Sequence, residues 1–336
     1  MKVAVFLTYN YSLQTWHDSK VLDRELSVYK ALFDQKKIKF DFFSYGSEYE
    51  NELLKNYPEF KVFQLIPHNS KSTNKIIRLI KSFMINKNIL LQLKNYDIFH
   101  QHQLLGSWIA IRYKNKLKKP LLTRTGYDMY EFAIHNKESF LRRLFLYTLT
   151  RITIRNSEIF TVASKSDKNF LQSLNLTNSK TIEIRPNWVL DNYKMPIEKR
   201  NKFEVITVGR LENQKNYLEL VEKFTEESRY KLKIIGNGEL KEELAKKISR
   251  NKLNVEIFDN IDNSSLLQIM NEHTFYISSS LFEGNPKTVL EAMSSGCIVI
   301  ATDIKNHKEL ITHNENGYLF NFINSDIIEI LDELIE

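Results

Sequence analysis

The sequence predicts an α/β protein of two domains, each built on a parallel β-sheet with helices on both faces. Strand-like runs of apolar and β-branched residues alternate with helix-like segments along both halves of the chain. A length of 336 residues exceeds the usual size of a single hydrophobic core. The segment 185–202 has neither a helical nor a strand period and carries two prolines. We therefore expect a linker there, between domains of residues 1–185 and 186–336.

The first domain is expected to contain six strands and four intervening helices. Short apolar runs predict the strands at 2–7, 38–45, 61–66, 97–102, 120–125 and 158–164. Apolar residues at three- and four-residue steps predict helices at 18–33, 74–93, 107–116 and 139–155.

The second domain is expected to repeat this alternation. Its predicted strands lie at 204–209, 230–236, 254–259, 275–280 and 297–302, and helices are expected at 216–224, 240–249 and 264–271. One more short helix lies before the last of these strands. Asn285 is expected to cap its N-terminus, with Pro286 at its first position. Gly296 is expected to end it in the left-handed conformation.

Composition describes an ordinary globular protein, with 42% hydrophobic and 26% charged residues. The single cysteine, Cys297, excludes a disulfide framework and a cysteine-based zinc site, and we expect it in the core. No signal-peptide pattern and no run of 18 apolar residues is present. A cytoplasmic setting is therefore the expectation.

Charge is divided unevenly between the halves. The net charge of +7 is the sum of +14 in residues 1–185 and −7 in residues 186–336. The two domains are therefore expected to present different surfaces to their partners.

Three predicted strand ends in the second domain carry groups suited to an anionic nucleotide ligand. Arg210 and Lys215 follow the strand that ends at Gly209 and offer two cations to a diphosphate. A Gly-Asn-Gly turn, Gly236 to Gly238, follows the next strand. Glu283 and Glu291 frame the start of the short helix, whose free N–H groups attract anions.

These groups are expected to converge, because the carboxyl ends of parallel strands meet at one edge of a sheet. Carboxylates pair well with ribose and sugar hydroxyls, which are neutral hydrogen-bond donors. A ligand with phosphate, ribose and a hexose therefore accounts for the cations, the glycines and the carboxylates together.

Four motifs of the second half resemble the donor domain of the retaining GT-B glycosyltransferases of group 1, also called family 4. They are VGRLENQKN, IIGNGEL, EGNPKTVLEAMSSGCIVIATD and the interdomain run PNWVLDNYKMP, within roughly residues 185–320. The resemblance implies two Rossmann-like domains with a cleft between them. It also implies an N-terminal acceptor domain and a C-terminal nucleotide-sugar donor domain.

The resemblance implies a role for each motif residue. Arg210 and Lys215 would hold the donor diphosphate, Glu291 the ribose and Glu283 the transferred sugar, so we name Arg210, Lys215 and Glu283 as catalytic. The donor-binding residues would be Gly209, Gly236, Gly238, Gly284, Asn285, Lys287, Thr288 and Glu291. Transfer would proceed with retention and without an enzymic nucleophile. No metal and no cofactor is expected, since the UDP- or GDP-linked sugar is a substrate.

The first half resembles the family in two stretches, DIFHQHQLLGSWIA and LLTRTGYDMY. Thr125 stands where the family usually has a histidine, and the glycine-rich loop usual after the first strand is replaced by TYNYSLQTWHD. His102, Arg124 and Asp128 are the acceptor-side candidates.

The leading hypothesis is a hexosyltransferase that builds a surface polysaccharide or glycolipid on a glycan or lipid-linked acceptor. A nucleotide-sugar epimerase and a catalytically silent subunit that supports a partner enzyme remain as alternatives. The basic helices predicted within 75–94 and 139–156 either pack into the core or place the protein peripherally on the anionic inner face of the membrane. No nucleic-acid-binding pattern is present.

Overall fold

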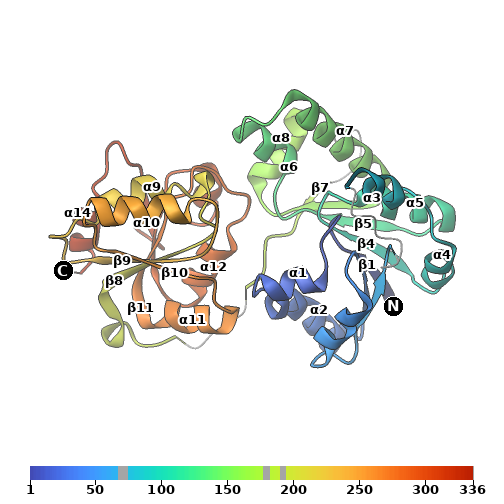
Figure 1. Cartoon of the computed structure of the whole chain (residues 1–336), viewed down its shortest axis with the longest axis horizontal. Coiled ribbons are helices and arrows are strands. Elements are labelled where there is room, and N and C mark those ends of the chain that lie inside the picture. The colour runs from blue at the N-terminus through green and yellow to red at the C-terminus, as the bar shows by residue number, and fades with distance from the viewer. Residues whose placement is uncertain (67–74, 177–181, 190–193, 336) are drawn as a thin grey trace. The chain divides into compact units, whose positions relative to one another are not determined.

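The computed structural model describes residues 1–66, 75–176, 182–189 and 194–335. Its contacts divide the chain into an N-terminal unit, Met1–Pro186, and a C-terminal unit, Asn187–Glu336. Each unit is a parallel sheet covered by helices, so the predicted α/β class with two Rossmann-like domains is confirmed (Figure 1).

The N-terminal unit contains a seven-stranded parallel sheet in the order β3-β2-β1-β4-β5-β6-β7. Its strands are β1 (Lys2–Phe6), β2 (Lys39–Ser44), β3 (Lys61–Gln64), β4 (Ile98–His102), β5 (Leu121–Arg124), β6 (Ile159–Val162) and β7 (Ile182–Ile184). The first six lie within the predicted ranges. The sequence analysis missed β7, because three residues are too few to show a period.

The helices of this unit are α1 (Leu13–Asp18), α2 (Leu22–Lys36), α3 (Lys75–Ser82), α4 (Lys87–Leu93), α5 (Ser107–Leu117), α6 (Met129–His135), α7 (Phe140–Asn156) and α8 (Lys165–Ser173), with a 3-10 helix η1 (Glu48–Leu54). The single helix predicted at 74–93 is wrong. Its described part divides into α3 and α4, because Asn86 leaves the helical conformation and caps α4 by accepting a hydrogen bond from Asn88 N. The helix predicted at 18–33 instead begins at Leu22, after the separate α1.

Alternate residues of β1 point into two different cores. Val3 and Val5 pack with the side chains of α1 and α2, whereas Ala4 and Phe6 pack with those of α4, α5 and α7. Because successive strand residues face opposite sides, these two cores place α1 and α2 on one face of the sheet and α4, α5 and α7 on the other.

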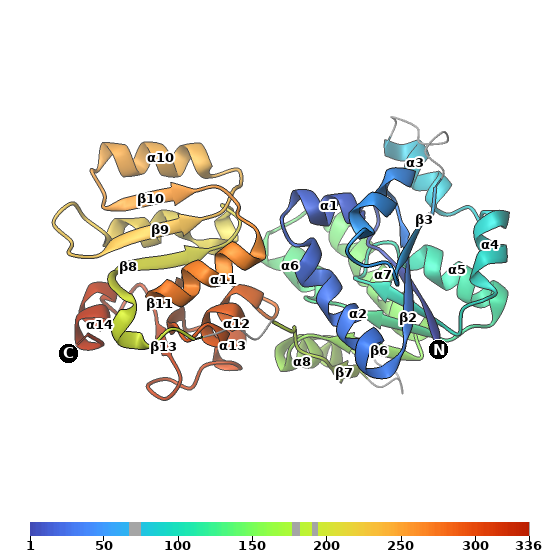
Figure 2. The same ribbon diagram turned by 90° about the horizontal axis from the view of Figure 1, so that it is seen from below.

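The C-terminal unit contains a six-stranded parallel sheet in the order β10-β9-β8-β11-β12-β13. The strands are β8 (Asn201–Val208), β9 (Lys231–Ile235), β10 (Val255–Phe258), β11 (His273–Ser278), β12 (Ile298–Thr302) and β13 (Tyr318–Phe320). Its helices are α9 (Tyr217–Leu220), α10 (Lys241–Arg250), α11 (Asn263–Glu272), α12 (Lys287–Ser294), α13 (Lys305–Lys308) and α14 (Ile327–Glu333) (Figure 2). Short 3-10 helices are η3 (Ile197–Lys199), η4 (Asn213–Lys215) and η5 (Val221–Lys223). The short elements β13, α13 and α14 were not predicted.

The predicted cap of α12 is wrong in one respect. Pro286 is the N-cap residue and the helix begins at Lys287, while the Asn285 side chain accepts a hydrogen bond from Asn187 N. The predicted end is confirmed, because Gly296 has a φ of +80°. Cys297 is buried and its thiol donates to the Met270 carbonyl, as expected for a core residue.

Each sheet reverses its winding at one point. In the C-terminal unit the chain runs outward from β8 through β9 and β10, then returns to place β11 on the other side of β8. In the N-terminal unit the same reversal occurs between β1 and β4. Ligands of open α/β sheets bind beyond the carboxyl ends of the strands at such a switch point.

Candidate functional site

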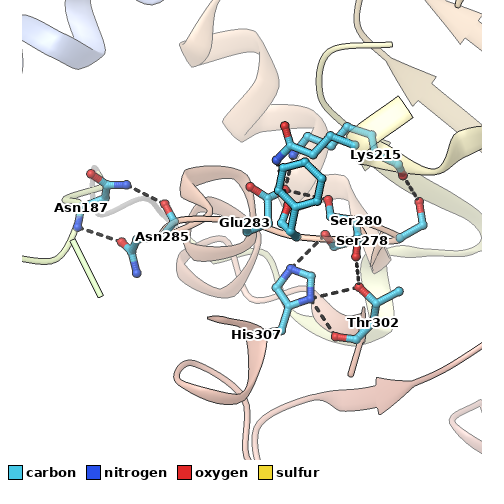
Figure 3. A network of polar contacts seen from close by, with 11 residues as sticks. Asn187, Lys215, Ser278, Ser280, Glu283, Asn285, Thr302 and His307 are labelled. Carbon is cyan, nitrogen blue, oxygen red and sulfur yellow. Dashed lines mark hydrogen bonds and ion pairs between the residues drawn. The ribbon is translucent and has the colours of Figure 1, made fainter. Parts of the chain in front are cut away.

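The loops that follow β8 and β11 lie side by side at the switch point of the C-terminal unit. Gln214 Nε2 donates to the Phe282 carbonyl at 2.8 Å, and Leu281 N donates to the Gln214 carbonyl at 2.9 Å. Ser279 Oγ donates to the Lys215 carbonyl at 2.6 Å. These bonds fix the two loops as one surface, from which Lys215 and Glu283 project (Figure 3).

Lys215 and Glu283 form a largely buried ion pair, with Lys215 Nζ 2.5 Å from Glu283 Oε1. Their side chains are only 16% and 9% exposed. Ser280 Oγ donates to the same carboxylate oxygen at 2.6 Å. Burial raises the pKa of Glu283, but the Lys215 ammonium and the Ser280 hydroxyl outweigh burial and hold that pKa below its usual value. Glu283 is therefore a carboxylate that can accept hydrogen bonds from hydroxyl groups.

The absence of a side chain at Gly209 leaves room for the Lys215 side chain. A Cβ atom at position 209 would lie 2.9 Å from Lys215 Cε and 2.9 Å from the Tyr217 hydroxyl. A larger residue at position 209 would therefore require the Lys215 or Tyr217 side chain to shift.

The fully buried His307 contacts the end of β11 and the end of β12. His307 Nδ1 lies 2.8 Å from the Thr302 carbonyl, which only accepts, so Nδ1 carries the proton in the neutral ring. His307 Nε2 is then the acceptor for Ser278 Oγ at 3.3 Å. Burial lowers the pKa of His307, which keeps the ring neutral at pH 7. Thr302 Oγ1 continues the network by donating to the Ser280 carbonyl at 2.5 Å (Figure 3).

Glu291 lies on the buried side of α12. Asn263 Nδ2, from the first residue of α11, donates to Glu291 Oε1 at 2.9 Å. This hydrogen bond fixes one oxygen of the carboxylate in position.

The loop before α12 is tied down on both sides. Asn187 N donates to Asn285 Oδ1 at 2.8 Å, and Asn187 Nδ2 donates to the Asn285 carbonyl at 2.6 Å (Figure 3). Asn306 Nδ2 donates to the Gly284 carbonyl at 2.5 Å. The Lys287 ammonium lies 4.9 Å from the ring centroid of Trp188.

The remaining predicted donor residues are placed differently. Arg210 is 69% exposed at its side chain and pairs with Glu212 at 2.9 Å. Thr288, on α12, hydrogen bonds through its side chain to Tyr276 of β11. The structure thus brings Lys215, Glu283 and Ser280 together and leaves Arg210 at the surface.

Gly236 and Gly238 meet a packing requirement between loops. A Cβ atom at Gly236 would lie 1.9 Å from the Gly209 carbonyl oxygen, and one at Gly238 would lie 2.5 Å from the Leu211 carbonyl oxygen. Only glycine lets the loop after β9 approach the loop after β8 this closely.

The N-terminal unit holds a second polar cluster at its own switch point. His102 and Arg124 are paired residues of β4 and β5, and both are buried. Glu25 of α2 reaches this cluster, with its Oε2 3.9 Å from His102 Nε2. Asp128 instead caps α6, because its carboxylate accepts from Glu131 N at 2.7 Å. Thr125 hydrogen bonds with both its N–H and its hydroxyl to the Thr161 carbonyl and so extends the pairing of β5 with β6.

Sequence reasoning missed several residues of both clusters. Glu25 had a signal, because it falls among Leu22, Leu26 and Tyr29 on the buried side of its helix. Ser280, Thr302 and His307 had none, since single Ser, Thr and His residues occur everywhere in a chain of this composition.

In the part of the chain that the structure describes, no group of three or more His, Cys, Asp or Glu side chains is arranged to hold a metal ion. Within the same residues, every helix is too short or too polar to cross a membrane.

Comparison with known proteins gives the class of this fold. HepE of Anabaena, in complex with UDP and glucose, superposes with a TM-score of 0.71 at 15% identity, over 100% of this chain and 90% of that chain. The lipopolysaccharide outer core galactosyltransferase WaaB superposes with a TM-score of 0.68 at 20% identity, over 99% of this chain and 89% of that chain. The fold is that of the GT-B glycosyltransferases.

The sequence comparisons agree with this class. Residues 192–336 match the family model for group 1 glycosyl transferases. An uncharacterised glycosyltransferase of Methanocaldococcus jannaschii is 25% identical over 308 residues, which are 83% of this chain and 71% of the relative. The C-terminal part of the chain thus resembles the group 1 glycosyl transferases in sequence, and the chain has the GT-B fold.

A further relative matches over a shorter stretch. It is the N-acetylgalactosamine-N,N'-diacetylbacillosaminyl-diphospho-undecaprenol 4-alpha-N-acetylgalactosaminyltransferase of Campylobacter jejuni, 32% identical over 126 residues. The aligned part is 36% of this chain and 33% of that enzyme.

Proposed function

We propose that this protein is a retaining glycosyltransferase that moves a hexose-type sugar from a UDP- or GDP-linked donor to a glycan or lipid-linked acceptor. The observation that carries the proposal is the buried Lys215–Glu283 pair at the switch point of the C-terminal unit. A cation for phosphate and a carboxylate for sugar hydroxyls lie there in contact, which suits a ligand that bears both groups.

In this proposal the donor replaces contacts that the free protein makes with itself. The diphosphate forms an ion pair with the Lys215 ammonium, and Arg210 turns from Glu212 to bind the phosphate. The backbone N–H groups at the start of α12, near Lys287 and Thr288, add hydrogen-bond donors at the positive end of that helix. Glu283 then accepts from a hydroxyl of the transferred sugar and Glu291 from the ribose.

Catalysis would rest on electrostatics that are already in position. Negative charge grows on the leaving diphosphate as the glycosidic bond breaks, and Lys215 and Arg210 stabilise it. The acceptor hydroxyl attacks the same face, and the leaving diphosphate oxygen takes its proton. Removing one such stabilising group typically lowers kcat by about 10²–10³. On the acceptor side we propose His102 and Arg124, with Asp128 positioning α6.

The relatives support the acceptor class. The Campylobacter jejuni relative is named for transfer to a diphospho-undecaprenol-linked sugar, and so is an Escherichia coli alpha-1,3-galactosyltransferase that is 29% identical over 155 residues. We propose that this chain likewise acts in surface polysaccharide or glycolipid synthesis, on the cytoplasmic side of the membrane and without a metal ion.

A silent donor-fold subunit is the second candidate. The observation that favours it is Thr125, whose backbone and hydroxyl are both committed to β6, where the family usually has histidine.

The test is turnover of a panel of UDP- and GDP-sugars by the full chain in EDTA, with undecaprenyl-diphosphate sugars as acceptors. Acceptor-dependent release of one nucleoside diphosphate, with a new α-linked product, is the expected result. Conversion of the donor sugar without acceptor would identify an epimerase. Nucleotide binding without turnover of any donor would favour the silent subunit.

A further inference from the structure

Helix α7 of the N-terminal unit is apolar on its exposed side. Leu146, Leu149 and Ile154 face the core, as expected for a helix on a sheet. Yet Leu141 is 76% exposed and Leu144 is 48% exposed. An exposed apolar stripe on a helix whose inner side is already packed has no role in the folding of this unit.

Helix α3 and the two residues that follow it also expose apolar side chains. Ile80 and Met84 are 60% and 65% exposed. Phe83, directly after α3, stacks on Trp108 of α5 with 5.3 Å between ring centroids, and Phe145 of α7 is a further ring neighbour of Trp108 at 6.5 Å. Trp108 therefore joins the two helices, and we call the surface made by Ile80, Phe83, Met84, Leu141, Leu144 and Phe145 the α3–α7 face.

The charge around this face has one sign. Helices α3, α4, α5 and α7 contain lysine or arginine and no aspartate or glutamate. Arg151 and Arg155 lie exposed on α7 beyond the apolar residues. Two acidic neighbours are paired: Glu138, before α7, pairs with Arg142, and Glu158, after α7, pairs with Lys114 of α5. The charged residues within these four helices are thus all positive.

We propose that the α3–α7 face docks on an anionic lipid surface. Apolar side chains of this size enter the boundary between headgroups and acyl chains, while the arginines and lysines beside them contact anionic headgroups. The same charge disfavours a second copy of this chain, because two such faces would place arginine against arginine. Nucleic acid would pair with the arginines but would leave the exposed leucines, methionine and phenylalanines in contact with phosphate and water.

This docking is independent of glycosyl transfer, so either proposal can fail alone. The substitutions that test it lie on exposed positions outside both polar clusters. Leu141→Glu/Leu144→Glu places two carboxylates on the face. The matched control, Tyr49→Glu/Ile323→Glu, adds the same charge at positions that are 71% and 91% exposed elsewhere.

The experiment is co-sedimentation of the purified full chain with vesicles of phosphatidylcholine, with and without phosphatidylglycerol. The wild type is expected to bind the anionic vesicles at least tenfold better, and less well at high salt. Leu141→Glu/Leu144→Glu should lower that binding at least tenfold, whereas the control should bind like the wild type. Arg151→Gln/Arg155→Gln should lower binding to anionic vesicles while leaving any weak binding to neutral vesicles unchanged.

Three outcomes would overturn the proposal. One is equal sedimentation with both kinds of vesicle or with neither. Another is equal loss in the control variant. The third is a wild-type dimer that Leu141→Glu/Leu144→Glu converts to monomer without changing lipid binding, since the face would then be a self-association surface. Circular dichroism of each variant separates loss of binding from loss of folding.

Discussion

Replacing Lys215 by methionine should destabilise the C-terminal unit far more than replacing an exposed lysine with the same ion-pair distance. Lys215 Nζ lies 2.5 Å from Glu283, and Lys231 Nζ lies 2.5 Å from Glu256. Side-chain exposure is 16% and 9% in the first pair but 33% and 47% in the second. The two pairs therefore differ in burial and not in distance.

The magnitudes follow from that difference. Removing one partner of a buried pair leaves an uncompensated charge and costs about 3–5 kcal/mol. Because Ser280 still donates to Glu283, we place Lys215→Met near the lower end, at about 3 kcal/mol. Lys231→Met should cost at most about 1 kcal/mol, as exposed pairs do. Lys215→Met/Glu283→Gln should recover about 1–2 kcal/mol relative to Lys215→Met, because no buried charge is then left unpaired.

The pH dependence of stability provides an independent check that the Lys215–Glu283 pair stabilises the fold. The pKa of Glu283 is lowered in the folded protein, so its ionisation contributes stability above its unfolded value and loses it as the pH falls through the folded value. Glu283→Gln removes this contribution, so the stability of that variant should depend less on pH below about 4.5 than the stability of the wild type does.

Hydrogen exchange with mass spectrometry in increasing urea is the assay, because peptides from β8, β11 and β12 report the C-terminal unit alone. The reasoning is refuted if Lys215→Met costs no more than Lys231→Met. It is refuted equally if the Lys215 and Glu283 substitutions add within about 0.5 kcal/mol.

Three further predictions concern residues around the two clusters. Burial lowers the pKa of His100 to about 3, so the N-terminal unit should lose stability as the pH falls below 6.5, by up to about 1.4 kcal/mol per pH unit. His100→Phe should abolish this pH dependence of the unfolding free energy, as measured by urea unfolding. Thr302→Val leaves the Ser280 carbonyl without its hydroxyl donor, so the unfolding free energy should fall by about 1–3 kcal/mol. Nucleotide affinity, measured by titration calorimetry, should fall as well. Unchanged affinity would contradict a positioning role for Thr302. Gly236→Ala forces a Cβ to within 1.9 Å of the Gly209 carbonyl, so thermal unfolding should occur several degrees lower, whereas Gly46→Ala, where the close atoms belong to the Glu50 side chain, should shift it less.

The central strands could be predicted because they are buried on both faces. Runs such as KVAVF and IVIAT are apolar at nearly every position, which is typical of parallel sheets. The edge strands β7 and β13 have three residues each, and their pairing depends on neighbours far along the chain. The break between α3 and α4 was missed because the apolar period continues through it. The Asn86 side chain hydrogen bonds to the backbone of α4 and so favours a helix start at this point over a continuous helix.

The candidate site could be predicted only where the chain carries a local signature. Glu283 and Glu291 were proposed from the loop, helix and glycine between two apolar strands. The assignment of Asn285 as a cap followed the same local rule and failed, because Asn187 competes for its side chain across 98 positions of sequence. His307 was missed for a similar reason, since its partners Ser278 and Thr302 come together only when β11 pairs with β12.

The most direct measurement is calorimetric titration of the full chain with UDP, GDP, CMP and ADP in EDTA. The wild type, Lys215→Met, Glu291→Gln and the exposed-site control Lys231→Met would be compared. The account predicts selective binding of one nucleotide, at least tenfold weaker in Lys215→Met and in Glu291→Gln and unchanged in Lys231→Met. Failure of the wild type to bind any of the four at millimolar concentration, or equal binding by all variants, would contradict a donor site at the loops after β8 and β11.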